Sequence, residues 1–174
     1  MIQFRRATLV DPQALGQVQV TSWRSAFRGI ASDDYLDHQA NVENQVEDWK
    51  KILTDDTQLV FVAENDQHLI GYAWAQREKN PDIEWDSELI SMHLLPAFKR
   101  QGIGRKLFST VSTELQKQGC ASVYLWVFED NRSARAFYES LGGKLAGKQQ
   151  INLGGKDLIE VTYGWKDISE LLRH

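Results

Sequence analysis

The sequence has a single cysteine, Cys120, among its 174 residues. One thiol cannot form an intramolecular disulfide and has no second sulfur with which to hold a metal cluster. Since free cysteine behaves mostly as a small hydrophobe, we expect Cys120 to be a buried core residue rather than a nucleophile. The low cysteine count favours a reducing compartment, and we predict a cytoplasmic protein.

Long apolar runs are also missing. No segment approaches the roughly 20 apolar residues of a membrane span, and residues 1–10 lack the apolar stretch of a signal peptide. Positive charge is not in excess either, because the formal net charge is -4. We therefore expect neither a membrane partner nor a nucleic-acid partner, and any site for an anion must be a local feature.

Linkers, repeats and low-complexity segments are absent too. Domains commonly run to roughly 100–200 residues, so one domain spanning residues 1–174 is the natural expectation. The six tryptophans and seven phenylalanines indicate an ordered core. Hydrophobic periodicity predicts helices at 13–27, 42–53, 103–118 and 131–141, and strands at 2–6, 59–63, 69–74, 88–95, 122–128, 144–151 and 158–165.

The most informative segment is Lys99–Lys106, KRQGIGRK, between a predicted strand and a predicted helix. Gly102 and Gly104 have no Cβ, so backbone N–H groups can approach a ligand there. The N-terminus of the following helix directs about half a positive charge at the same point. These features, with four cationic side chains nearby, predict a site for a pyrophosphate.

A loop with two glycines can also have a purely structural role or belong to another nucleotide-binding fold. A solvated glycine turn with surface cations remains open. The P-loop pattern is absent, and the dinucleotide-binding pattern fails because Leu107 stands at its third glycine position. Two rival nucleotide folds are therefore disfavoured.

The segment Lys99–Gly104 resembles the acetyl-CoA signature of the GNAT acetyltransferases, [Q/R]-x-x-G-x-[G/A], with lysine in the first position. Glu88–Pro96 resembles the fourth strand of that family, Leu125–Asn131 its fifth strand, and Arg135–Gly142 the helix that follows. The resemblance implies an α/β (α+β) GNAT fold. Its mixed central sheet has about seven strands, with the fourth and fifth splayed apart, and helices flank it.

The same resemblance implies acetyl-CoA as co-substrate, without a metal. The pantetheine arm would pair with the backbone of Met92, His93 and Leu94, and the Leu94 N–H would polarise the thioester carbonyl. Asn131 would fix the pantetheine amide, and Tyr138 would protonate the departing thiolate. The loop residues assigned to the cofactor are Lys99, Arg100, Gln101, Gly102, Ile103, Gly104 and Arg105.

Two of the expected roles have structural alternatives. Tyr138 is either the acid or a buried aromatic beside Phe137. Glu88 lies where some members of the family carry a general base, and burial on an apolar strand would raise its pKa; a charged residue at a solvent-exposed strand end is an equal alternative. Strict strand alternation turns His93 away from the face of Glu88 and Met92, which favours a structural histidine, although a bulge would change that parity.

We expect the acceptor to be the primary amine of a small molecule, bound beside the N-terminal helices and the last hairpin. Acetylation of a protein N-terminus or lysine, which needs an open groove, and a non-catalytic acyl-CoA sensor both remain open. A homodimer is possible. We expect none of His38, His68 and His174 to bind a metal. The acceptor-side candidates are Trp23, Phe27, Tyr35, Trp49, Glu88, Trp126, Glu160, Tyr163 and the segment 152–156, with Asp82, Glu84 and Asp86 adding negative charge nearby.

Overall fold

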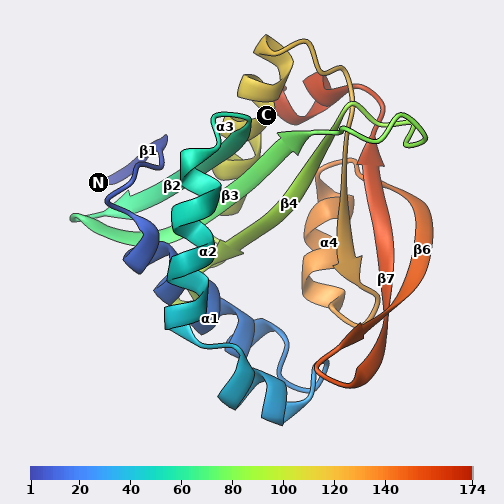
Figure 1. Cartoon of the computed structure of the whole chain (residues 1–174). Helices are drawn as coiled ribbons and strands as arrows, with labels where there is room; N and C mark the ends of the chain where they lie inside the picture. The colour runs from blue at the N-terminus through green and yellow to red at the C-terminus, as the bar shows by residue number, and fades with distance from the viewer. Residues whose placement is uncertain (174) are drawn as a thin grey trace.

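The computed structural model describes residues 1–173, so His174 lies outside the described residues. A seven-stranded sheet with the order β1-β2-β3-β4-β5-β7-β6 forms the centre of the protein (Figure 1). The strands are β1 (Ile2–Arg6), β2 (Gln58–Asn65), β3 (His68–Arg77), β4 (Ser87–Leu94), β5 (Val123–Phe128), β6 (Lys144–Leu153) and β7 (Lys156–Trp165). Only β4 and β5 pair in parallel, which confirms the predicted mixed sheet.

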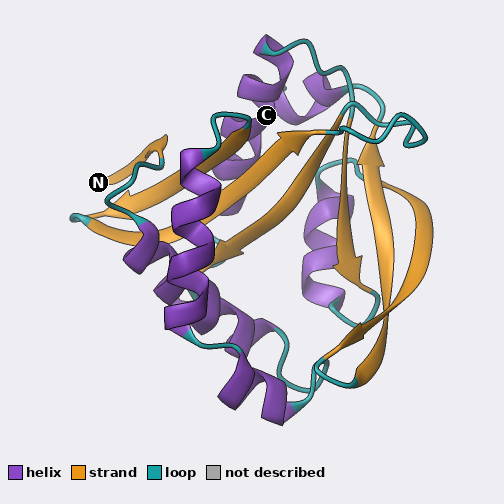
Figure 2. Cartoon of the chain, in the orientation of Figure 1, coloured by secondary structure: helices purple, strands orange, loops and turns teal. Residues whose placement is uncertain are grey.

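Helices cover both faces of the sheet (Figure 2). On one face α1 and α2 bury Leu15 and Trp49 against Tyr72 of β3. On the other face α3 buries Phe108 and Val111 against the sheet. Truncating a buried aromatic of this kind costs about 3–5 kcal/mol, so the sheet depends on both layers. The helices are α1 (Pro12–Ala26), η1 (Tyr35–Gln39), α2 (Val42–Thr54), η2 (Pro96–Phe98), α3 (Ile103–Lys117), α4 (Arg132–Ser140) and η3 (Ile168–Leu172).

Local sequence explains where these helices begin. Pro12 opens α1, and its missing N–H is harmless in the first turn of a helix. Asn41 precedes α2 and accepts a hydrogen bond from the Asn44 N–H over 2.9 Å. Between residues 1 and 173, no helix combines the length and apolarity that crossing a lipid bilayer requires.

The strands β4 and β5 separate after a single point of contact. Their only paired residues are Glu88 and Tyr124, and beyond them the two strands diverge (Figure 1). The predicted splay is therefore confirmed. Because the facing edges have no strand partner, their backbone N–H and C=O groups are available to an extended ligand.

A bulge in β4 changes which side chains share a face. Ser91 pairs with Trp74 and Leu89 with Ala75, so Ile90 is an extra residue in β4. Strict alternation is therefore wrong for this strand. Glu88, Ser91 and His93 lie opposite Gln76, Trp74 and Tyr72 on the face covered by α1 and α2, whereas Leu89, Met92 and Leu94 lie opposite Ala75, Ala73 and Gly71 on the other face.

Candidate functional site

A cavity of about 1090 Å³ opens between the splayed strands and reaches both faces of the sheet. On the α3 side it is lined by the glycine-containing loop, Met92, Leu94 and α4. On the α1 side it is lined by aromatic side chains. Two molecules that enter from opposite faces could therefore meet in the gap.

Most of the residues predicted for the site line this cavity, but three of those assigned to catalysis or to the cofactor do not. Gln101 turns back to donate a hydrogen bond to the Ala97 carbonyl over 3.1 Å, and Ile103 is buried in the core below the loop. Glu88 lies where β4 and β5 meet and is also outside the lining. The predicted residues that do line the cavity are Trp23, Phe27, Tyr35, Met92, His93, Leu94, Lys99, Arg100, Gly102, Gly104, Arg105, Trp126, Asn131, Tyr138 and Glu160.

The backbone of the loop before α3 is shaped to expose N–H groups. Arg100 and Gly102 have left-handed φ angles of 59° and 79°, a conformation that glycine adopts freely and arginine rarely. The Lys106 N–H donates to the Gly102 carbonyl, so the preceding N–H groups of the first turn have no partner one turn back. Together with the helix dipole, these groups favour an anion.

The edge of β4 directs a backbone donor into the gap. The Leu95 N–H donates to the Ile70 carbonyl of β3 over 2.8 Å. Since successive N–H groups of an extended strand point to opposite sides, the Leu94 N–H points away from β3 and toward β5. A carbonyl oxygen in the gap could accept a hydrogen bond from it.

Tyr138 of α4 is buried at 8% exposure and lines the cavity. Its ring packs edge-on against Phe108 and Phe137, with centroid distances of 6.3 and 5.3 Å. Burial raises the pKa of Tyr138, so the phenol is protonated at neutral pH. Its hydroxyl has no hydrogen-bond partner among the described residues, which leaves it able to donate to a bound group.

Two further interactions hold α4. Asn131 caps the helix by accepting a hydrogen bond from the Ala134 N–H over 3.2 Å, and its side-chain NH₂ stays available as a donor. The Tyr163 hydroxyl of β7 donates to the Glu139 carboxylate and accepts from Arg135 over 3.1 Å. Tyr163 therefore braces α4 from the buried side, and its expected place at the acceptor mouth is wrong.

The aromatic chamber on the α1 side is built from Trp23, Phe27, Tyr35, Trp126 and Phe128. The rings of Phe27 and Phe128 pack edge-on at 4.9 Å, and those of Trp23 and Tyr35 stack at 6.4 Å. The sequence reasoning missed Phe128, although it lies two residues after Trp126 and therefore on the same face of β5.

Trp49 is not a wall of the aromatic chamber, contrary to expectation. It is 1% exposed, donates its indole N–H to Gln19 over 2.7 Å and packs against Tyr72. The expected acidic cluster also has other roles. The Asp86 carboxylate accepts from the N–H groups of Ala121 and Ser122, Glu84 pairs with Lys166, and neither lines the cavity.

His93 lines the cavity as an uncharged ring. The Trp23 indole N–H donates to His93 Nε2 over 2.9 Å, so the ring proton lies on Nδ1. Burial lowers the pKa of His93 to about 3, and the charge of Lys99 contributes to the lowering. A histidine whose lone pair is already engaged, and whose pKa is this low, is a poor proton acceptor at neutral pH.

The carboxylates near the gap lie on different strands. Burial raises the pKa of Glu88, and the neighbouring carboxylates of Glu78 and Glu160 contribute to the rise. Glu160 of β7 lines the aromatic chamber and accepts a hydrogen bond from Gln149 over 3.1 Å. Glu160 is therefore the carboxylate that a molecule in the chamber would meet first.

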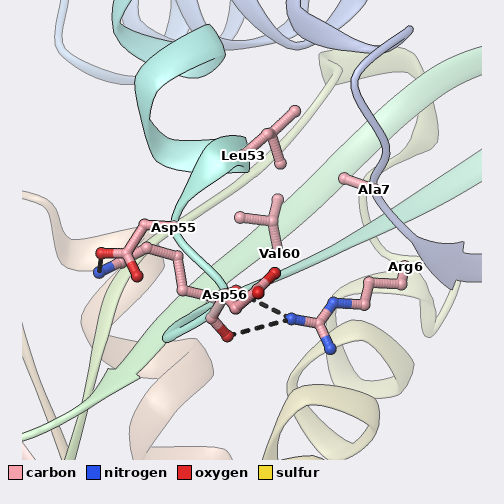
Figure 3. A pocket seen from close by; sticks show the side chains of 7 residues that line it. Arg6, Ala7, Leu53, Asp55, Asp56 and Val60 are labelled. Atoms are coloured by element: carbon pink, nitrogen blue, oxygen red, sulfur yellow. Dashed lines mark hydrogen bonds between the residues drawn. The ribbon is translucent and has the colours of Figure 1, made fainter.

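A second, smaller hollow of about 280 Å³ lies between the end of α2 and the residues after β1 (Figure 3). Its cation, Arg6, donates to the carbonyl oxygens of Asp56 and Gln58 over 3.5 and 3.3 Å. Arg6 and these two carbonyl groups therefore satisfy one another. Residues 1–173 contain no group of three or more His, Cys, Asp or Glu side chains that could hold a metal ion.

Comparison with known proteins gives one consistent result. Residues 20–143 match the family described as Acetyltransferase (GNAT) family. Over 172 residues the chain is 31% identical to YuaI, an uncharacterized N-acetyltransferase of Bacillus subtilis (strain 168), and the match covers 98% of this chain and 96% of YuaI.

A relative matched over a shorter segment and a solved structure agree with this result. Over 57 residues the chain is 40% identical to the ribosomal protein bS18-alanine N-acetyltransferase of Escherichia coli (strain K12), covering 33% of this chain and 38% of that protein. The fold resembles that of the PaiA N-acetyltransferase of Thermoplasma acidophilum, solved in complex with coenzyme A, with a TM-score of 0.78 and 22% identity over 95% of this chain and 99% of that one.

Proposed function

Because the chain belongs to the GNAT family of acetyltransferases, we propose that it transfers the acetyl group of acetyl-CoA directly to the primary amine of a small molecule, with both substrates bound at once. The observation that carries this proposal is the single cavity that joins the glycine-containing loop to the aromatic chamber through the gap between β4 and β5. Direct transfer requires the reacting atoms to lie about 3–3.5 Å apart, and such a gap brings them together.

In this proposal the cofactor is held by backbone as much as by side chains. The N–H groups of the loop and of the first turn of α3 bind the pyrophosphate, and Lys99, Arg100 and Arg105 add charge. The free edge of β4 pairs with the pantetheine arm like an added strand. Asn131 donates its free side-chain NH₂ to a pantetheine carbonyl. Bound acetyl-CoA supplies the acetyl group as a thioester.

Four groups then assist the reaction. The Leu94 N–H donates to the thioester oxygen as negative charge develops on it. The Tyr138 hydroxyl gives its proton to the sulfur as the carbon–sulfur bond breaks. Glu88 accepts through water the proton that the ammonium group must lose before it attacks, since its carboxylate lies outside the cavity lining. The second proton, which the nitrogen loses after the attack, restores the Tyr138 hydroxyl. Glu160 attracts the ammonium form of the amine into the chamber.

A contact across the chamber supports a small acceptor over a protein chain. The backbone of Gly154, at the tip of the β6–β7 hairpin, packs so closely on Tyr35 that a Cβ there would lie 2.6 Å from the Tyr35 Cβ. Lys156 donates a hydrogen bond to the Ile30 carbonyl from the same tip. Residues 30–35 and the tip of the β6–β7 hairpin thus meet over the acceptor side (Figure 1), where an extended peptide would need an open groove.

The alternatives make different predictions. The bS18-alanine relative modifies a protein, as its name states, and a peptide N-terminus is the corresponding alternative acceptor here. A non-catalytic sensor of acyl-CoA would need Asn131 to hold the cofactor but would not need the Tyr138 hydroxyl, a proton donor, in the cavity lining.

Thiol release from acetyl-CoA distinguishes these functions when a panel of small primary amines is compared with short peptides bearing a free N-terminus or a lysine. We expect turnover with members of the amine panel. Turnover with peptides alone would support the protein-modifying alternative, and acetyl-CoA binding without turnover of either class would support the sensor.

A further inference from the structure

Trp126 differs from the other tryptophans of the chain. Four of the six tryptophans donate their indole N–H groups to other residues, and Trp85 lies under the ammonium group of Lys166, 4.1 Å from the centre of its ring. Among residues 1–173, Trp126 has no hydrogen bond from its indole and no aromatic ring packed against it. It is also the only residue of β5 that is not buried, and it lines the cavity. The indole of Trp126 is therefore left for a bound molecule to cover.

The walls around Trp126 are aromatic as well. Phe128 lies two residues further along β5, on the same face, and packs edge-on against Phe27 at 4.9 Å. Trp23 lies four residues before Phe27, with its ring 6.1 Å from that of Phe27 and 6.4 Å from that of Tyr35. Offset-stacked and edge-on pairs of aromatic rings are favourable beyond the apolar area that they bury. The aromatic chamber therefore favours a flat aromatic ring over an aliphatic group of similar size.

One carboxylate lies beside these rings. Glu160 of β7 pairs with Phe128, and Thr162, two residues further along β7, pairs with Trp126. Paired residues of antiparallel strands share a face, and their diagonal neighbours are about 7–8 Å apart, so Glu160 lies on the same face as Trp126. A short amine whose ring covers the indole can therefore reach the Glu160 carboxylate.

The charges of the cavity wall limit what the acceptor can carry. Of the described residues that line the cavity, the cations are Lys99, Arg100 and Arg105 of the loop before α3, and the one carboxylate is Glu160. An acidic group on the acceptor would face Glu160 without a cation beside it. A polyamine would bring several ammonium groups to a single carboxylate. The chamber therefore matches one positive charge and no negative charge.

We propose that the acceptor is an arylalkylamine, in which an aromatic ring that packs on Trp126 is joined by a short chain to one primary ammonium group that Glu160 attracts, with no acidic group. This inference rests on the proposed function and names its substrate class more narrowly. Trp126 and Glu160 are then the residues that select the acceptor, the first by its ring and the second by its charge.

The first arm of the test isolates the ring. Thiol release from acetyl-CoA gives kcat/KM for 2-phenylethylamine and 2-cyclohexylethylamine, which differ in aromaticity, in the wild type, Trp126→Leu and Trp85→Leu. We expect the phenyl-to-cyclohexyl ratio to fall about fivefold in Trp126→Leu, which keeps an apolar side chain but removes the aromatic partner. Trp85→Leu should keep the wild-type ratio, because Trp85 is also half-buried but does not line the cavity.

The second arm isolates the charge. L-phenylalaninamide and L-phenylalanine have the same skeleton, but the first carries a neutral carboxamide and the second a carboxylate. We expect the ratio of kcat/KM for the amide to that for the acid to fall about fivefold from the wild type to Glu160→Gln. Glu84→Gln is the matched control, since Glu84 pairs with Lys166 and does not line the cavity. Comparing ratios between proteins cancels the different amine pKa values of the two compounds.

Equal ratios in the wild type and Trp126→Leu would overturn the packing of the acceptor on Trp126, and equal ratios in the wild type and Glu160→Gln would overturn the role of Glu160. In both cases, turnover of primary amines would leave the proposed function intact. A higher kcat/KM for cadaverine, a diamine, than for 2-phenylethylamine would also contradict an arylalkylamine acceptor. No thiol release with any primary amine, despite acetyl-CoA binding, would contradict the proposed function and this inference together.

Discussion

The indole N–H of Trp23 donates a hydrogen bond over 2.9 Å to Nε2 of His93, which joins α1 to β4 at the wall of the cavity. The rings of Phe27 and Tyr72 lie 6.0 and 5.6 Å from the same histidine. The packing of these rings and the hydrogen bond from Trp23 keep the imidazole uncharged at neutral pH. They also hold His93 in place in the wall of the aromatic chamber.

The first prediction concerns the pH dependence of stability. The pKa of His93 is lowered from 6.5 to about 3 in the folded protein, so between these pH values the unfolded chain binds a proton that the folded chain does not. The contribution of His93 to the free energy of unfolding is therefore fully present above pH 6.5 and is lost as the pH falls toward 3.

Urea unfolding at about pH 7.5 and about pH 5 measures this effect, and we expect His93 to contribute about 1–2 kcal/mol to the loss of stability between them. His93→Phe keeps an aromatic ring but cannot titrate, so its loss should be smaller by that amount. An equal loss in both proteins would mean that His93 is protonated normally in the folded state.

The second prediction concerns Tyr138. Replacing it by phenylalanine keeps the ring packing against Phe108 and removes the proton donor. We expect Tyr138→Phe to lower kcat by about 10²-fold or more, with little change in acetyl-CoA affinity. Tyr72→Phe is the matched control, because the buried Tyr72 hydroxyl accepts a hydrogen bond from Ser91 and Tyr72 does not line the cavity. Unchanged turnover in Tyr138→Phe would remove Tyr138 from the chemistry.

The third prediction concerns Glu88 as the proton acceptor. Burial and the Glu78 carboxylate raise its pKa, so a protonated and inactive form accumulates as the pH falls through that raised value. We expect the wild-type kcat/KM to decline on that acid limb. Glu88→Gln should have a lower kcat/KM than the wild type above this pH, and its kcat/KM should not show this decline at acidic pH. A pH–rate profile of Glu88→Gln that matches the wild type would show that another group takes the proton.

The fourth prediction concerns the contact that closes the acceptor side. Gly154 and Gly155 both have positive φ angles, 57° and 80°, but only a Cβ at 154 would strike Tyr35, since nothing lies within 4 Å of one at 155. Gly155→Ala therefore controls for backbone strain. We expect Gly154→Ala, and not Gly155→Ala, to displace Tyr35 and raise kcat/KM for bulkier amines several-fold relative to small ones. An identical substrate range in the two variants would mean that this contact does not limit acceptor size.

Much of the fold follows from the sequence, because the strands and helices carry strong local signals. The run from Leu59 to Ala63, the periodic apolar residues of α3, and Gly142 after α4 each indicate an element that the structure contains. The loop before α3 was also predictable, since glycines at a helix N-terminus expose backbone N–H groups and nearby cations favour an anion.

Other features depend on tertiary contacts that no local pattern encodes. The extra residue Ile90 in β4 is set by pairing with β3, and it decides that His93 shares the acceptor face with Glu88. The contact between Gly154 and Tyr35 joins segments far apart in the chain. Trp49 is a residue type that often lines pockets, but here it is buried beneath α1. Its burial depends on how the helices pack, which the local sequence does not show.

The most direct test of the account is calorimetric titration of acetyl-CoA into the wild type and Gly104→Trp, with NADH as the comparison ligand. A Cβ at Gly104 already lies 3.4 Å from the Phe137 ring, so an indole there must occupy the cavity beside the loop. We predict that the wild type binds acetyl-CoA and not NADH. Gly104→Trp, once circular dichroism has shown that it is folded, should bind neither. Absence of acetyl-CoA binding by the wild type, or unchanged binding by Gly104→Trp, would contradict the assignment of this loop and cavity to the cofactor.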